Sequence, residues 1–222
     1  MNKPTNVLIV EQEPLVSFSI EEALTIVTKQ LSGTQFKSKS YRSYECALAE
    51  MSSSKPFGLV FLNINFVHGS YDTTHHVKDL VDAVRRNSPK THLLTLTSVH
   101  DNFIITEMIK TLNPECVLLK KDVSFNELVR AIKDVINCIP FYSQTILKCL
   151  RSRMTCDIAL DKRDRLILYH LSKGIKTKDL PKLVFLSKSA VESRKRNLKL
   201  LFSVEQKPDY FLLEQARLKG FI

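Results

Sequence analysis

The chain has 222 residues, of which 44% are hydrophobic and 25% are charged, and its formal net charge is +10. This composition is typical of a globular protein, and the length suffices for one core of about 140 residues and a second of about 65. We find no apolar run near 18 residues, no signal peptide and no lipidation motif, so we expect a cytoplasmic protein without a membrane partner.

The first 140 residues alternate short apolar runs with helical patterns. Strands are expected at 7–10, 36–41, 59–62, 93–97 and 117–119. Helices are expected at 14–31, 43–51, around the stripe Val77, Leu80, Val81 and Val84, at 104–112 and at 128–136. Five such β/α units predict an α/β domain with a parallel, doubly wound (flavodoxin-like) sheet, covered on both faces, whose site lies at the carboxyl ends of the strands.

Residues 139–157 join this region to the rest of the chain. Pro140 ends the preceding helix, and Ile146, Leu147 and Leu150 then give a short amphipathic segment. Two interpretations stay open: a helix packed on either domain, or a connector that fixes the orientation of the two. The expected division is a domain at 1–138, a linker at 139–157 and a second domain at 158–222.

The C-terminal domain is predicted to be all-α. Asp161, Thr177 and Ser187 are plausible N-caps of three successive helices, and Gly174 suits the left-handed position after the first. The expected inward residues are Leu166, Ile167, His170 and Leu171 in the first helix, Leu180, Leu183 and Val184 in the second, and Val191, Leu198 and Phe202 in the third.

The third of these helices has a polar face opposite its apolar stripe. Arginine can pair with guanine, glutamate can accept from cytosine, and serine and lysine suit phosphate oxygens. The face and its flanks consist of Ser189, Glu192, Ser193 and Arg196, with Arg194, Lys195, Asn197 and Lys199 beside them. The pattern predicts a helix-turn-helix module that binds double-stranded DNA; the alternative is a solvated, charged helix face.

Charge is divided unevenly along the chain. Residues 148–222 hold 18 Lys and Arg against 8 Asp and Glu, whereas residues 1–147 hold 15 of each kind. A basic excess confined to one domain is typical of a protein that contacts phosphate groups.

The motifs LxxRxxxILxxLxxGxxxKDL and FLSxSxVESxxxN, starting at Leu160 and Phe185, resemble the C-terminal domain of LuxR/NarL/FixJ-type transcription regulators. The family's usual Leu-Thr-x-Arg-Glu opening is replaced by residues 160–164, a mild departure. The resemblance implies base contacts from Glu192, Ser193 and Arg196. It implies phosphate contacts near Lys178, Ser187, Lys188 and Ser189. Residues 208–219, with Tyr210, Leu213 and Leu218, resemble the helix through which such domains pair, so we expect a homodimer.

The segments VLIVEQEPLV, LVFLNINF, LLTLTSVHD and VLLKKDVS resemble a response-regulator receiver domain over residues 5–138. In that family two acids after the first strand and an aspartate ending the third hold Mg²⁺, and this aspartate accepts a phosphoryl group. Here those positions carry Glu11, Gln12 and Asn63. The phosphate-contacting hydroxyl and ammonium positions carry Thr97 and Lys120, with Lys121 leaving the register open by one residue.

The substitutions imply a degenerate phosphorylation site. An amide cannot form an acyl phosphate, and one glutamate supplies too little charge to hold Mg²⁺ well. Lys120 is then free to pair with Glu11. A shifted metal pair of Glu11 with Glu13 is the weaker alternative, and no metal is expected.

Sequence motifs for catalysis are missing. We find no G-x-G-x-x-G, P-loop, G-x-S-x-G or H-E-x-x-H pattern, and the five cysteines include no C-x-x-C pair. We therefore expect neither an enzyme nor a cofactor. The preferred function is phosphorylation-independent transcription regulation. The alternative is a non-catalytic adaptor that binds protein or RNA, and an unknown signal protein or small ligand at the receiver-like domain stays open.

Overall fold

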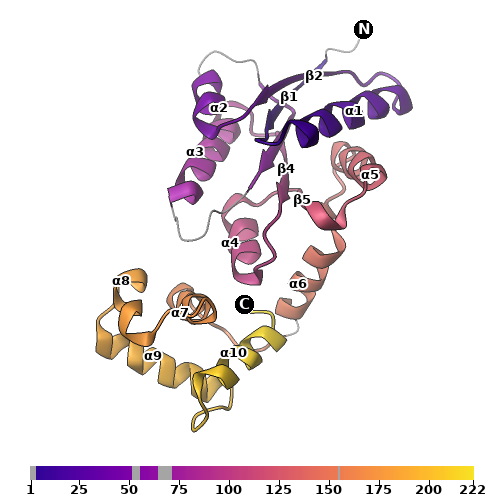
Figure 1. Ribbon diagram of the computed structural model, residues 1–222. Helices are drawn as coiled ribbons and strands as arrows, with labels where there is room; N and C mark the ends of the chain where they lie inside the picture. The colour runs from indigo at the N-terminus through magenta and orange to yellow at the C-terminus, as the bar shows by residue number, and fades with distance from the viewer. Residues whose placement is uncertain (1–3, 52–55, 65–71, 155) are drawn as a thin grey trace. The chain divides into compact units, whose positions relative to one another are not determined.

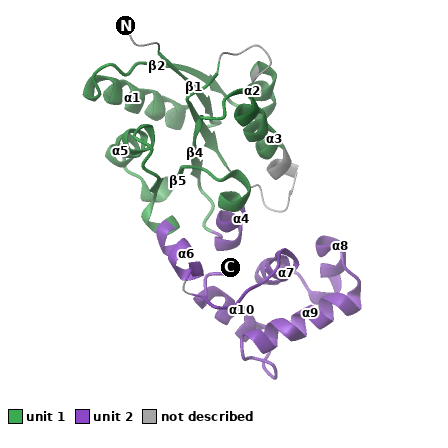
Figure 2. Cartoon of the chain, turned by 180° about the vertical axis from the view of Figure 1, so that it is seen from behind, with its two compact units in different colours: residues 1–100, 108–146 green, residues 101–107, 147–222 purple. Residues whose placement is uncertain are grey.

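The computed structural model describes residues 4–51, 56–64, 72–154 and 156–222. The chain forms two compact units (Figures 1 and 2). Unit 1 comprises residues 1–100 and 108–146, and unit 2 comprises residues 101–107 and 147–222.

Unit 1 is built on a parallel sheet with strand order β2-β1-β3-β4-β5-β6. Its strands are β1 (Thr5–Val10), β2 (Phe36–Tyr41), β3 (Leu59–Asn63), β4 (His92–Thr97), β5 (Cys116–Leu119) and β6 (Phe141–Tyr142). β3 and β5 are buried along their whole length, as parallel strands covered on both faces must be. This confirms the predicted α/β fold.

Helices cover both faces of this sheet (Figure 1). They are α1 (Pro14–Gln30), α2 (Tyr44–Met51), α3 (Asp72–Asn87), α4 (Asn102–Leu112) and α5 (Phe125–Ile136), with a 3₁₀ turn at Lys120–Asp122. Apolar residues of α1 and α5 form one continuous core with the facing residues of β1, β3, β4 and β5. Burial of this apolar area is the main source of the unit's stability.

The sheet has one strand more than the sequence predicts. Phe141 and Tyr142 pair in parallel with Cys116 and Val117. Two residues are too few to show a strand period, which explains why the pattern does not reveal them. The helix α6 (Gln144–Met154) follows; in its expected apolar stripe Ile146 is buried but Leu147 is 52% exposed, so that stripe is only partly correct.

The part of unit 2 after α6 is all-helical, as predicted. It contains α7 (Lys162–Ser172), a 3₁₀ turn at Thr177–Asp179, α8 (Leu180–Val184), α9 (Lys188–Leu201) and α10 (Asp209–Leu218). Every one of these helices contributes to one hydrophobic core, whose members include Ile167, Leu180, Val191, Leu198, Phe202, Leu212 and Phe221. α7, α8 and α9 form the three-helix unit expected of a helix-turn-helix domain (Figure 1).

The caps of these helices partly follow the prediction. The Asp161 carboxylate accepts from the Asp164 amide at 2.8 Å, the Ser187 hydroxyl accepts from the Ala190 amide at 3.2 Å, and Gly174 has φ +81°. These three predictions are confirmed. Thr177 makes no cap because a 3₁₀ turn begins there.

The inward face of α8 also differs from the prediction. Leu180 and Val184 are buried, whereas Leu183 is 39% exposed. A helix of five residues makes little more than one turn, so residue spacing alone cannot define its buried side. No helix in the described segments is long and apolar enough to cross a membrane.

Candidate nucleic-acid interface and the altered receiver site

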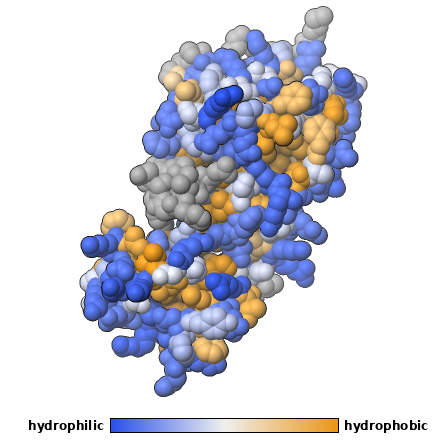
Figure 3. All heavy atoms as spheres, in the orientation of Figure 1, coloured by the Kyte–Doolittle hydropathy of each residue, from blue (hydrophilic) through white to orange (hydrophobic). Residues whose placement is uncertain are grey.

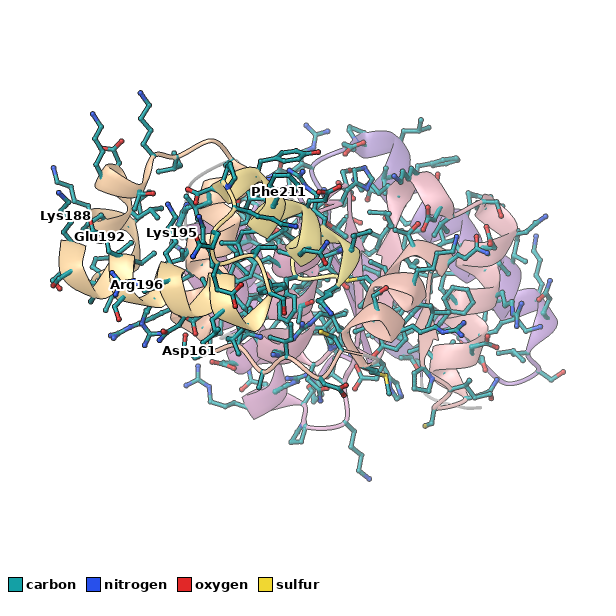
Figure 4. The ribbon with its side chains drawn as sticks, turned by 90° about the horizontal axis from the view of Figure 1, so that it is seen from below. Asp161, Lys188, Glu192, Lys195, Arg196 and Phe211 are labelled. Atoms are coloured by element: carbon teal, nitrogen blue, oxygen red, sulfur yellow. The ribbon has the colours of Figure 1, made fainter. Side chains whose placement is uncertain are left out.

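The exposed face of α9 is the centre of the candidate interface. Val191 and Leu198 anchor the helix in the core with at most 1% exposure. On the opposite side Glu192, Ser193 and Arg196 are exposed, as their spacing of three and four residues requires. Figure 4 shows Lys188, Glu192 and Arg196 following one another along the helix. The predicted base-contacting residues thus share one accessible surface.

The N-terminal end of α9 completes this surface. Lys188 and Ser189 are exposed, and the hydroxyls of Ser187 and Ser189 lie 3.1 Å apart. The first amides of a helix and its dipole favour an anion at this end. Ser187 therefore stabilises the helix start at the point where a phosphate group would approach.

Arg194 is fixed inside the domain by two carboxylates. Its Nη1 atom lies 2.7 Å from Asp161 Oδ2 and 2.8 Å from Asp164 Oδ1. The hydrogen bonds to Asp164 and Asp161 raise the pKa of Arg194. Burial alone would raise the pKa of Asp161, but the Asp164 amide and the Arg194 guanidinium hold it below its usual value. Arg194 thus joins α9 to the start of α7.

Lys195 and Lys199 are held by Asp209 at the start of α10. Lys195 Nζ pairs with Asp209 and lies 2.8 Å from the Thr177 hydroxyl. Lys199 Nζ lies 3.1 Å from Asp209 Oδ1 and 2.6 Å from the Lys207 carbonyl. Burial opposes ionisation of Asp209, but the two ammonium groups bring its pKa below the usual value. These two predicted DNA-contacting lysines therefore also connect α9 to α10.

Other cations of the domain remain available. Lys178, Lys188 and Arg196 are exposed, and no carboxylate in the described part of the chain lies within ion-pair distance of them. Asn197 is exposed beside Arg196. Sequence reasoning could not separate these groups from Arg194, Lys195 and Lys199, because the acidic partners lie on other helices.

The helix α10 presents apolar side chains to solvent. Tyr210 is 63% and Leu218 is 72% exposed, and Phe211, with 38% exposure, stacks edge-on against Tyr210 at 5.6 Å. Leu213, in contrast, is partly buried against the core. The surface expected to pair two copies therefore consists of Tyr210, Phe211 and Leu218, with Leu213 supporting it from inside.

In unit 1 the parallel register brings the altered receiver residues to one edge of the sheet. Val10 pairs with Leu62, Asn63 with Leu96, and Thr97 with Leu119. Glu11, Asn63, Thr97 and Lys120 thus occupy the carboxyl ends of the strands, and all but Lys120 are buried.

Glu11 makes most of the contacts within this cluster. Its Oε1 atom accepts from Asn63 Nδ2 at 2.5 Å and from the Glu13 amide at 3.0 Å, and its Oε2 atom lies 3.2 Å from Lys120 Nζ. Lys120 Nζ also lies 2.7 Å from Glu13 Oε1. The expected pairing of Lys120 with Glu11 is confirmed, and it selects Lys120 over the exposed Lys121.

Two further contacts close the cluster. The Thr97 hydroxyl donates to the Ile64 carbonyl at 2.7 Å and accepts from the Val99 amide. The Tyr44 hydroxyl, which sequence reasoning missed, donates to the Asn63 carbonyl. Burial and then the charge of Glu11 raise the pKa of Tyr44, so its phenol stays a donor. No sequence signal marked Tyr44, because it lies on α2 rather than at a strand end.

The residues present do not fit Mg²⁺, the ion that the receiver resemblance implies. Glu11 is already neutralised by Lys120, and Gln12 is exposed. Asn63 points its amide hydrogens at Glu11; its side-chain oxygen is buried without a hydrogen-bond partner among the described residues. One neutral oxygen beside an ammonium group is not the carboxylate-rich set that Mg²⁺ prefers.

Comparison with known proteins places these two regions in one architecture. No family model matches the chain. The Fimbriae Z protein of Salmonella typhimurium is 25% identical over 201 residues, which cover 88% of this chain and 89% of that protein.

Solved structures of RcsB share the fold. A structure of RcsB from Salmonella enterica serovar Typhimurium, bound to a promoter in the presence of the phosphomimetic BeF₃⁻, aligns with a TM-score of 0.60 at 16% identity, over 96% of this chain and 98% of that one. A structure of two RcsB dimers bound to two parallel DNAs gives 0.59 at 16% identity, over 97% and 99%. The isolated REC domain of RcsB gives 0.51 at 16% identity, over 66% and 98%.

The Fimbriae Z protein and the two DNA-bound RcsB structures match 88% to 97% of the chain, including both of its domains. The chain therefore shares the fold of RcsB over nearly its whole length, with a receiver-like α/β domain followed by a helix-turn-helix domain.

Proposed function

We propose that this protein is a transcription regulator that binds double-stranded DNA through α9 and acts as a homodimer. The observation that carries the proposal is the exposed face of α9, where Glu192, Ser193 and Arg196 project from a helix capped by Ser187. The RcsB structures with the same fold include complexes with DNA and dimers. An α-helix fits the major groove, and these side chains can pair with base edges.

The residues of the interface divide into two roles. Glu192, Ser193, Arg196 and Asn197 are placed to read bases, since they lie on the exposed face of α9. Ser187, Lys188 and Ser189 lie at its N-terminal end, where the helix dipole favours phosphate. Lys178 lies in the 3₁₀ turn whose Thr177 hydroxyl accepts from Lys195, and it is the fourth candidate for a phosphate contact. Lys195 and Lys199 form ion pairs with Asp209 in the protein without DNA. A DNA phosphate would therefore compete with the Asp209 carboxylate for these two lysines.

Substitution of Arg196 and of Lys188 tests the proposal. Arg196→Ala is expected to reduce specific binding by about 1 to 3 kcal/mol, because a bidentate contact to guanine is lost. Lys188→Ala is expected to weaken binding to all sequences and to lower the slope of log K against log salt by about one unit, because one phosphate contact is lost. Gel-shift titrations over a salt series, with a duplex selected from a random pool, measure both effects.

Lys90→Ala is the matched control, since Lys90 is an exposed lysine in unit 1 and its loss should leave the slope unchanged. An affinity of the full-length protein that ignores salt and both α9 substitutions would remove DNA binding as the function.

We further propose that phosphorylation does not control this binding. The support is the state of the strand-end cluster, where an amide stands at the acceptor position and Lys120 neutralises Glu11. A regulator needs a ligand that binds one conformation better than another. Without an acceptor carboxylate or a Mg²⁺ site, the phosphoryl group cannot be that ligand here.

A further inference from the structure

The turn between α8 and α9 contains a residue in a backbone conformation that its type disfavours. Phe185 has φ +53° and ψ +51°, which is the left-handed helical region. Glycine and asparagine adopt this conformation readily, whereas a bulky aromatic residue does so only under constraint. The position closes α8 through the Phe185 amide, which donates to the Pro181 carbonyl. The turn therefore needs this conformation but not this side chain.

The side chain of Phe185 also gains nothing from burial. It is 86% exposed, while its neighbours Val184 and Leu186 are buried or partly buried in the core. A single exposed apolar residue is ordinary. An exposed aromatic ring at a position that favours glycine is unusual. In the isolated domain both the left-handed backbone conformation and the solvent exposure of the ring are unfavourable.

The surroundings of Phe185 indicate what it meets. Lys182 and Lys188 flank it in sequence and are exposed, and no carboxylate of the described segments pairs with either. Ser187, two residues on, caps the helix that carries the candidate base contacts. Figure 3 shows hydrophobic side chains at the surface of the α8 and α9 region, bordered by hydrophilic ones. An apolar group set among unpaired cations complements duplex DNA better than it complements an apolar protein surface.

We propose that Phe185 is a DNA-contacting residue that packs its ring on apolar groups of the duplex beside the N-terminal end of α9. Two such groups exist at the edge of the major groove, the methyl group of thymine and the deoxyribose rings. The inference rests on the proposed function and adds an apolar contact to a surface otherwise made of polar and charged residues.

Phe185→Asn separates this role from a structural one. Asparagine tolerates the left-handed conformation, so the melting temperature should stay the same or rise. Affinity for a labelled duplex selected from a random pool should fall about five- to tenfold, because the apolar contact is lost. The salt slope should not change, since no phosphate contact is removed. Phe185→Tyr keeps the ring and should retain most of the affinity.

Controls make the outcomes distinguishable. Met154→Ala removes another exposed apolar side chain, 87% exposed at the end of α6, and should leave affinity unchanged. A duplex with uracil in place of thymine identifies the contacted group: if wild type loses affinity and Phe185→Asn does not, the ring meets a thymine methyl, and if neither changes, it meets deoxyribose. The loss of affinity by Phe185→Asn on the thymine duplex is the result that supports the contact, and the uracil duplex then assigns the group that the ring meets.

Three results would overturn the proposal. Unchanged DNA affinity of Phe185→Asn beside a reduced salt slope of Lys188→Ala removes the contact and leaves the proposed function intact. Loss of transcription regulation by Phe185→Asn at unchanged DNA affinity places the ring against a protein instead. Absence of DNA binding by every variant, wild type included, removes the contact together with the function.

Discussion

Glu11 is buried in unit 1 and makes contacts with three other groups, so the strand-end cluster depends on this residue. Its side chain is only 1% exposed, and it bonds Asn63, Lys120 and the Glu13 amide. Glu11→Gln removes the charge that compensates a largely buried ammonium group. The free energy of unfolding should fall by about 1 to 3 kcal/mol, measured by urea denaturation.

Glu13→Gln is the control for this prediction because Glu13 pairs with the same Lys120 Nζ atom but is 55% exposed. Its loss should change the free energy of unfolding by about 0.5 kcal/mol or less, since solvent screens exposed pairs. Equal effects of the two substitutions would show that burial does not distinguish the two carboxylates.

Local contacts of single residues were predictable from the sequence, and distant ones were not. The caps Asp161 and Ser187 accept hydrogen bonds from amides three residues away, so residue type and spacing suffice to predict them. Lys195 meets Asp209 and Thr177 only after the chain has folded. The contact between Tyr44 and Asn63 crosses 19 residues and has no local signature.

At the scale of elements, α10 has two structural roles: it supports α9, and it exposes an apolar face. Its buried Leu212 and Ala216 hold it in the core, Asp209 binds two lysines of α9, and its other side exposes apolar residues. An apolar strip on a short surface helix is typical of a docking face. The same helix therefore supports α9, the helix proposed to contact DNA, and offers the surface through which two copies would pair.

Leu218→Lys tests this pairing. Leu218 is 72% exposed, so the fold should stay intact while a charge disrupts the contact between two copies. Cooperativity on a duplex with two half-sites about one helical turn apart should fall. Titration of paired and single half-sites measures the change. Substituting the partly buried Leu213 would damage the core as well.

Met154→Lys adds the same charge at another exposed apolar position and should leave cooperativity unchanged. Strictly monomeric binding of the unmodified protein to one half-site would contradict the role of α10.

The elements themselves differ in how well the sequence revealed them. The strands β1, β3 and β5 carry continuous apolar runs, and β4 is apolar apart from His92 and its threonines, because both faces of these strands are buried. α8 and β6 are only five and two residues long. Such short segments hold no full period, so the buried side of α8 and the existence of β6 depend on tertiary packing that a local pattern does not contain.

In the whole molecule, charge and chemistry are divided between the two parts of the chain. Residues 1–147 are neutral overall, and residues 148–222 carry the entire net charge of +10. The basic part is suited to a polyanion, whose binding weakens steeply with salt. The neutral part contains a receiver fold whose strand-end cluster is closed by Lys120, Glu11 and Asn63. Phosphorylation of the receiver-like domain and binding of DNA phosphates by the basic domain can therefore be tested independently in this protein.

Incubation with a small phosphoryl donor and Mg²⁺ is expected to leave the mass and the DNA affinity of the protein unchanged. Asn63 cannot form an acyl phosphate, and the Glu11 carboxylate that would bind Mg²⁺ is paired with Lys120. Asn63→Asp alone should not restore the reaction, because Gln12 still replaces the second metal-binding acid and the new carboxylate would face Glu11 across a distance now spanned by a hydrogen bond. Intact-mass spectrometry and gel-shift titration measure the two quantities on the same samples.

The double substitution Gln12→Asp with Asn63→Asp supplies the positive arm of this experiment, since it returns both acids that the receiver family uses. Phosphorylation of the double variant but not of the wild type would locate the loss of function in these two positions. A stoichiometric phosphoryl adduct on the wild type, with a gain of about tenfold in DNA affinity, equivalent to about 1.4 kcal/mol, would show that another residue accepts the phosphoryl group and that the receiver still responds to it.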